Sequence, residues 1–148
     1  MVETPPDALY EDALLIQLRE LDGPFAGGGD WQGSIVPSLW RGRRTHREAR
    51  PVAATIARTE TDVDGARAHR FALAAGEYRR TFDVEADAPH RVIAWTTSDG
   101  EDVRIRESAR LKYWELNHPG DEARREEFGL PSESAPTIEP PAGITIGP

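Results

Sequence analysis

The chain has 148 residues, a formal net charge of −8, 30% charged residues and 38% hydrophobic residues. This length allows one domain with a substantial core, and the negative charge disfavours a nucleic acid or an anionic membrane as partner of the whole protein. The sequence contains no cysteine, which excludes disulfides, thiolate metal sites and thiol nucleophiles. We find no apolar run near the roughly 18 residues of a membrane span and no signal peptide, so we expect a cytoplasmic protein; export stays open if a leader has been trimmed.

The N-terminal region predicts an amphipathic helix over residues 8–21, with Asp7 as its cap. Its apolar residues recur at helical spacing: Leu9, Ala13, Leu14, Leu18 and Leu21. The pair Gly23-Pro24 ends this helix, and a loop follows to residue 33.

The middle of the chain predicts antiparallel strands joined by short turns. The expected strands cover residues 34–40, 52–59, 66–74, 77–85, 91–98 and 102–114. Pro37 indicates that the first is a short strand or an edge strand, and the Asp99-Gly100 pair indicates a hairpin before the last. We therefore expect a mainly β (α+β) fold, an antiparallel meander of five or six strands curling toward a partial barrel.

Alternation of apolar and polar residues assigns the two faces of this sheet. The expected apolar face carries Phe71, Leu73, Tyr78, Phe82, Val84, Ile93, Trp95, Val103, Ile105, Leu111 and Tyr113. The leucines of the leading helix are the natural cover for this face.

The C-terminal region predicts a short helix from the cap Asp121 to Phe128, with Gly129 as its stop. Residues 131–148 are rich in proline and predict a flexible tail after a single domain over residues 1–130.

Arginines are concentrated in residues 40–50, WRGRRTHREAR, where neither helical nor strand periodicity is visible. This connection could contact phosphates, but a solvated loop that pairs with acidic neighbours is the favoured interpretation. Interleaved aromatic residues, typical of single-stranded nucleic-acid binding, are missing from it.

A second group of cations lies on one face of the expected last strand: Arg104, Arg106, Arg110 and Lys112. Small residues on the neighbouring strand would complete a shallow trough for a carboxylate or phosphate. The alternative is a solvent-facing side with ordinary cross-strand pairs. Trp95, Tyr113 and Trp114 supply aromatic walls for a ligand, or a second packing layer.

Other catalytic and metal-binding patterns are weak. The four histidines have no ligand spacing, no serine lies in a nucleophile-elbow motif, and Gly27–Gly29 is not followed by the residues of a phosphate loop. We therefore expect no metal and no cofactor. Glu107 falls on the apolar face by strict alternation, so either a bulge turns it outward or it is a buried carboxylate.

The segment from about residue 65 to 130 contains FDVEADAPHRVIAWTTSDGEDVRIRESARLKYWELN followed by PGDE. It resembles the closing half of uncharacterised bacterial β-rich proteins of a lipocalin-like, curved-sheet kind. The shared motifs concern hairpins and packing, so the resemblance implies an antiparallel curved sheet and assigns no functional residue.

These patterns favour a non-catalytic domain that binds a small amphipathic or anionic ligand through Arg104, Arg106 and Arg110, with Trp95, Tyr113 or Trp114 as walls. One alternative is a protein-interaction module, possible as a homodimer, that uses the leucine helix or the edge strand. A second alternative is an enzyme with a pocket acid such as Asp83 or Glu107.

Overall fold

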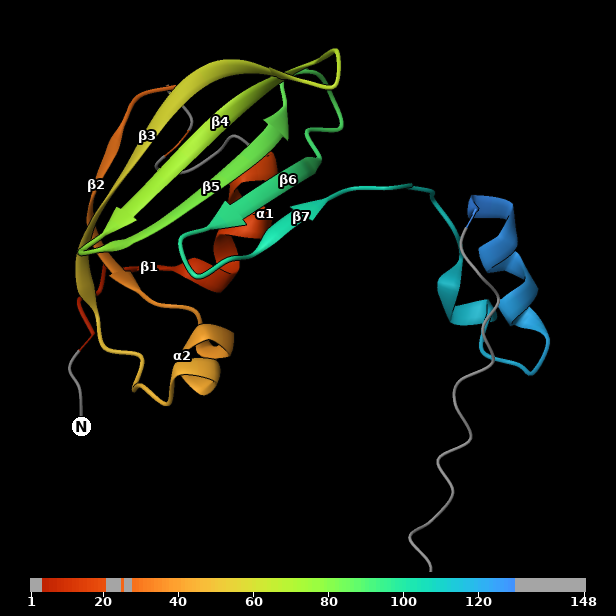
Figure 1. Cartoon of the computed structure of the whole chain (residues 1–148), viewed down its shortest axis with the longest axis horizontal. Helices are drawn as coiled ribbons and strands as arrows, with labels where there is room; N and C mark the ends of the chain where they lie inside the picture. Colours follow the sequence, from red (N-terminus) through yellow and green to blue (C-terminus); the bar gives the residue numbers. More distant parts are fainter. Residues whose placement is uncertain (1–3, 21–24, 26–27, 130–148) are drawn as a thin grey trace, which may run out of the picture. The chain divides into compact units, whose positions relative to one another are not determined.

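The computed structural model describes residues 4–20, 25 and 28–129, and its main feature is one seven-stranded sheet (Figure 1). The chain forms two compact units, residues 1–105 and 106–148. The sheet belongs to the first unit, with strands β1 (Leu9–Tyr10), β2 (Trp31–Val36), β3 (Val52–Val63), β4 (Ala66–Ala75), β5 (Tyr78–Glu85), β6 (Val92–Thr97) and β7 (Asp102–Arg104).

The strands lie in the order of the sequence from β1 to β7. All neighbours from β2 to β7 are antiparallel, whereas β1 pairs with β2 in parallel. The predicted β-rich fold is therefore confirmed, but the details differ from the predicted meander of five or six strands curling toward a partial barrel, because the sheet has seven strands, is mixed and is not closed. The parallel pair was missed because β1 has two residues, too few to show alternation.

The predicted faces agree with burial over the central strands. Phe71, Phe82 and Val84 are fully or almost fully buried, at 0 to 1% exposure. We call the side of the sheet that carries these three residues the inner face. A bulge between Asp83 and Val84 shifts the register toward β6, so Val84 lies opposite Val92, while Phe82 lies opposite Trp95.

The leading helix is shorter than predicted. Residues Glu11–Ala13 form the 3-10 turn η1, and the helix α1 covers Leu14–Glu20. Leu14 and Leu18 are fully buried and join the core of the inner face, as the leucine spacing predicts. Leu21 lies outside the described residues. Phe25 contacts the same core, with its ring 5.8 Å from that of Phe71.

The predicted strand over residues 34–40 is wrong in its second half. Strand β2 ends at Val36, since Pro37 has no N–H to donate to a ladder. Ser38 instead caps the helix α2 (Leu39–Thr45), its Oγ accepting from the Arg41 N–H at 3.4 Å. The arginine-rich stretch is therefore partly helical. The prediction of an edge strand is wrong as well, because β2 lies between β1 and β3.

The predicted last strand is also too long. The structure has β7 over Asp102–Arg104, followed by one further bond from the Ile105 N–H to the Ile93 carbonyl. Strand β6 begins at Val92, so residues beyond Arg106 have no neighbouring strand to pair with. Ile105 is 41% exposed, so its predicted place on the buried face is wrong.

The second unit contains two 3-10 helices in its described residues, η3 (Tyr113–Glu115) and η4 (Asp121–Phe128). The helical segment predicted to end at Phe128 is present, and Gly129 ends it in the left-handed conformation. Its N-cap is Gly120 rather than Asp121, whose carboxylate accepts from the His118 N–H at 2.7 Å. Residues 131–148, the predicted tail, lie outside the described residues.

Candidate functional site

A buried carboxylate organises one end of the inner face. Glu11 is 2% exposed and accepts hydrogen bonds from the Ser38 N–H at 3.0 Å, the Tyr78 hydroxyl at 2.9 Å and Nη1 of Arg80 at 2.9 Å. Its neighbour Asp12 accepts from the Leu39 N–H at 3.0 Å. The two acidic residues of η1 therefore hold the start of α2, while Glu11 also joins it to β5.

Local sequence explains this convergence. Tyr78 and Arg80 are two residues apart on β5, so both point to the inner face, together with Phe82 and Val84. The parallel pairing of Leu9 with Ile35 places η1 beside the end of β2, from which Ser38 follows directly.

Burial and the negative charge of Glu11 change the acidity of the phenol. The pKa of Tyr78 is raised well above its usual range, mainly by burial, then by the Glu11 charge and the hydrogen bond to it. The Arg41 guanidinium lies over the Tyr78 ring, 3.9 Å from its centroid. Tyr78 is therefore a hydrogen-bond donor held in place, and not a candidate base.

Arg80 is a buried cation, 8% exposed. Its guanidinium lies 4.6 Å from the ring centroid of Phe82 and 5.9 Å from that of Trp95. Nη1 of Arg80 donates a hydrogen bond to Glu11, whereas Nε has no hydrogen-bond partner among the described residues. An isolated buried charge is costly, so Glu11 is the counter-ion that allows Arg80 to lie here.

A pocket of about 380 Å³ opens beside this cation, and we call it the Arg80 pocket. It is lined by Asp12 and Leu15 from η1 and α1, Ser38, Trp40, Arg41 and Arg44 from the α2 region, Tyr78 and Arg80 from β5, Trp95 from β6, Glu101, and Val103 from β7. Its volume lies within the range of small-molecule sites, which is about 300–1,000 Å³. The lining combines aromatic surface with charged groups of both signs.

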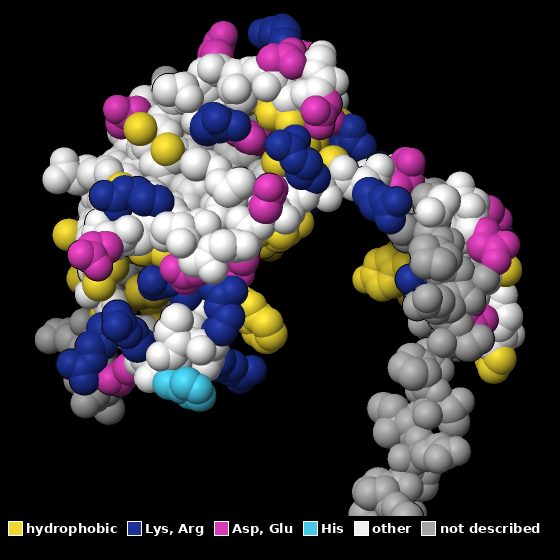
Figure 2. All heavy atoms as spheres, in the orientation of Figure 1, with side chains coloured by type: hydrophobic (Ala, Val, Ile, Leu, Met, Phe, Trp, Pro, Cys, Tyr) yellow, Lys and Arg dark blue, Asp and Glu magenta, His cyan; other side chains and the backbone are white. Residues whose placement is uncertain are grey.

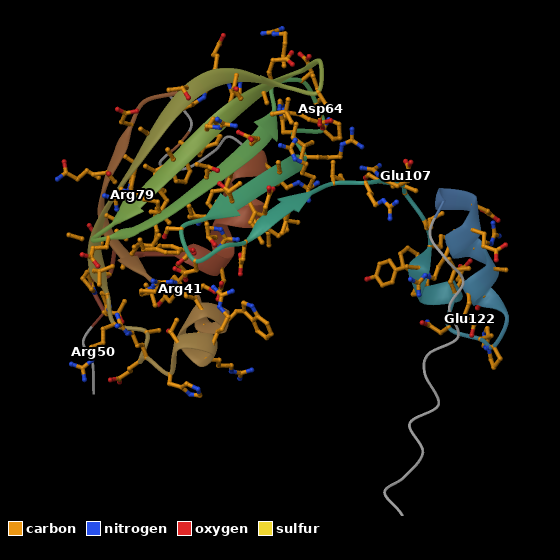
Figure 3. All side chains as sticks on the ribbon, viewed as in Figure 1. Arg41, Arg50, Asp64, Arg79, Glu107 and Glu122 are labelled. Carbon is orange, nitrogen blue, oxygen red and sulfur yellow. The ribbon has the colours of Figure 1, made fainter. Side chains whose placement is uncertain are left out.

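Ion pairs join α2 to the hairpin between β6 and β7 at the rim of this pocket. Asp99 accepts from Nε of Arg41 at 2.7 Å and from Nη2 of Arg44 at 3.2 Å, and Arg44 also reaches Glu101 at 3.5 Å. The hydrogen bond from Arg41 is the main cause that lowers the pKa of Asp99, so it stays ionised. The labelled Arg41 lies between α2 and the sheet (Figure 3).

The six predicted ligand-binding residues are not gathered on one strand face. Trp95 lies on the inner face and lines the Arg80 pocket. Arg104 pairs in register with Ala94 on the opposite, outer face and bonds Asp64 at 3.3 Å. The remaining four, Arg106, Arg110, Tyr113 and Trp114, belong to the second unit, where all four are exposed and outside the sheet.

Paired side chains cover the outer face where the trough was predicted. Arg70 binds Asp83 through two bonds of 2.7 and 2.9 Å, which makes Asp83 an ion-pair partner at 5% exposure rather than a pocket acid. Thr81 and Thr96 share a hydrogen bond of 2.7 Å. The alternative of ordinary cross-strand pairs therefore describes this face.

Glu107 is exposed and lies on no strand (Figure 3), so both predicted alternatives, a bulge that turns it outward and a buried carboxylate, are wrong. Its Oε1 accepts a hydrogen bond from the Ser108 N–H.

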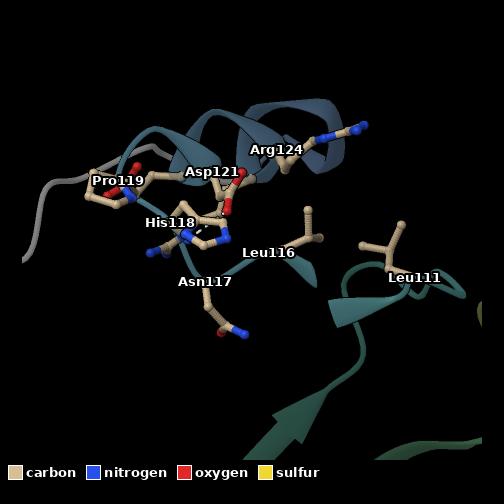
Figure 4. Close-up of a pocket in the computed structure, with 9 residues that line it drawn as sticks. Leu111, Leu116, Asn117, His118, Pro119, Asp121 and Arg124 are labelled. Atoms are coloured by element: carbon tan, nitrogen blue, oxygen red, sulfur yellow. Dashed lines mark hydrogen bonds between the residues drawn. The ribbon is translucent and has the colours of Figure 1, made fainter. Parts of the chain in front are cut away.

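The second unit has a larger but shallow hollow of about 590 Å³ (Figure 4). Leu111, Leu116 and Pro119 line it together with Asn117, His118, Asp121, Glu122, Arg124 and Arg125. Except for the half-buried Leu116 and Asp121, the side chains of this unit whose burial the structure describes are exposed.

Within the described part of the chain, no cluster of three or more His, Cys, Asp or Glu residues could hold a metal ion. Nor does any described helix have the length and hydrophobicity needed to cross a membrane.

Fold and pocket together define a small open-sheet domain, rich in antiparallel strands, with a buried arginine beside a pocket. A scan of protein-family models and searches of curated proteins and solved structures found no match to this chain. The lipocalin-like resemblance therefore stays a prediction.

Sequence reasoning missed Glu11, Tyr78 and Arg80 as site residues. A signal for Arg80 was present, because strict alternation places it on the same face as Tyr78, Phe82 and Val84. No comparable signal marks Glu11, because adjacent acids such as Glu11 and Asp12 are usually solvated.

Proposed function

We propose that this protein is a non-catalytic binding domain whose Arg80 pocket takes a small amphipathic anion. The observation that carries the proposal is a buried guanidinium that lines a pocket beside the aromatic wall of Trp95, and that bonds Glu11 through Nη1. The proposal replaces the predicted donors Arg104, Arg106 and Arg110 by Arg80 and keeps Trp95.

The charges around the pocket support one anionic group and not several. Arg41 and Arg44 already share Asp99 and Glu101, and Arg80 already has Glu11. A single carboxylate, sulfonate or phosphate would add hydrogen bonds to guanidinium groups that still have free N–H donors. The apolar part of the ligand would lie against Trp40, Trp95 and Val103.

A fluorescent probe with this chemistry is 8-anilinonaphthalene-1-sulfonate, which has one sulfonate and two aromatic ring systems. We expect saturable binding to one site on the wild-type chain, with competition by aryl carboxylates and aryl phosphates. Val103→Trp fills the pocket from the edge strand β7 and should abolish that site. Val63→Trp, at another half-buried valine outside the pocket, is the matched control and should leave it unchanged.

Binding that is equal in wild type and in Val103→Trp would refute the pocket as the site. Probe fluorescence that rises only when the protein unfolds would refute it as well. Circular dichroism and urea unfolding of both variants check that the sheet is intact.

A further inference from the structure

The arginines of helix α2 and of the residues that follow it fall into two groups. Arg41 and Arg44 pair with Asp99 and Glu101 of the β6–β7 hairpin. Arg43 and Arg47 are exposed, and neither forms an ion pair with any residue that the structure describes. The first pair attaches the helix to the sheet, whereas the guanidinium groups of the second pair make no ion pair within the described chain.

Exposed apolar side chains accompany these free cations. Leu39 is 65% exposed and Trp40 67% exposed, side by side at the start of α2. Figure 2 shows Lys and Arg side chains gathered over and around α2, with hydrophobic side chains beside them. Large apolar residues that stay in water next to unpaired arginines are typical of docking sites, where Trp and Arg dominate binding.

The surface is hollowed at this place. A depression of about 500 Å³ is lined by Leu39, Gly42, Arg43, His46, Arg47 and Ala49. The apolar residues Leu39 and Ala49 and the cations Arg43 and Arg47 therefore face one space. A hollow of this kind accepts a protruding side chain, while a flat lipid surface would contact only its rim.

We propose that α2 and residues 46–49 form a docking site for an acidic peptide segment of a partner protein. An apolar side chain of the partner sits on Leu39 and beside Trp40, and its carboxylates face Arg43 and Arg47. Charge complementarity selects this partner, because Arg43 and Arg47 are exposed cations without an ion pair among the described residues, in a chain of net charge −8. The same net charge repels nucleic acids and anionic membranes from the rest of the molecule.

The experiment uses the full chain and two fluorescein-labelled peptide pools. In one pool Asp or Glu alternates with random apolar residues, and in the other Lys replaces the acids. We expect anisotropy to show binding of the acidic pool only, weakened by salt. Arg43→Gln/Arg47→Gln should weaken it at least about fivefold, since two exposed charge contacts are lost. Leu39→Ala should weaken it too, because Leu39 lines the depression.

The matched control is Arg19→Gln/Arg67→Gln, which removes two exposed arginines outside α2 and should leave binding unchanged. Binding of the pocket probe by Arg43→Gln/Arg47→Gln should also persist, which separates this proposal from the function proposed for the Arg80 pocket. Absence of acidic-pool binding, equal binding of both pools, or equal loss in the control variant overturns the proposal. Arg43-dependent and Arg47-dependent binding to phosphatidylglycerol vesicles, without peptide binding, overturns it in favour of a lipid surface.

Discussion

Removing the charge of Glu11 is the most direct test of the buried cluster. Glu11→Gln keeps the side-chain volume, so no cavity forms, but it leaves the buried Arg80 without its counter-ion. It also turns one of the two acceptor oxygens into an amide donor, close to the Ser38 N–H or the Tyr78 hydroxyl. We expect a strongly destabilised sheet domain.

The magnitude follows from the burial of both partners, whose side chains are 2% exposed for Glu11 and 9% exposed for Arg80. Breaking a buried ion pair by removing one partner costs about 3–5 kcal/mol. The Arg80 pocket gives water a path to the guanidinium, which reduces the penalty, so we expect the lower end, about 3 kcal/mol. The matched control is Asp12→Asn, which also removes one negative charge from η1 but at an exposed residue, and keeps an oxygen that can accept from the Leu39 N–H. It should cost under about 1 kcal/mol.

Urea unfolding followed by tryptophan fluorescence measures these differences in the free energy of unfolding. A double-mutant cycle with Arg80→Met isolates the pair, and Glu11→Gln/Arg80→Met should be less destabilised than the sum of the single variants by at least about 1 kcal/mol. If Glu11→Gln costs no more than Asp12→Asn, or if the two single effects simply add, the buried pair is not the organising contact described above.

Two further predictions concern His69 and Ser38. Burial, followed by the charge of Arg58, lowers the pKa of His69, so the unfolded chain binds a proton that the folded chain does not. The free energy of unfolding should therefore fall as the pH drops below about 6.5. Urea unfolding at a series of pH values should show a weaker dependence of this free energy on pH in His69→Gln than in the wild type. The same pH dependence in both proteins would contradict the prediction. Ser38→Ala removes the cap of α2 and should cost about 1 kcal/mol, whereas equal stability of the variant and the wild type would show that the cap contributes nothing.

The sequence alone determined the central strands and the covering leucines. Residues 66–97 alternate over long strands, and a period of two specifies which side is buried, as Phe71 and Phe82 confirm. Leu14 and Leu18 reveal the covering helix because their spacing matches one helical turn. Both signals lie within short stretches of sequence, so each can be recognised without knowing which residues pack against that stretch.

Tertiary structure decided everything that depends on distant partners. The start of β6 at Val92 limits how far β7 can extend, and α2 has seven residues, too few for a visible period. Glu11 became a buried counter-ion because the sheet brings it to Tyr78 and Arg80, 67 and 69 residues further along the chain. Whether a carboxylate is solvated or buried depends on what surrounds it after folding, and two neighbouring acids in a sequence carry no record of that difference.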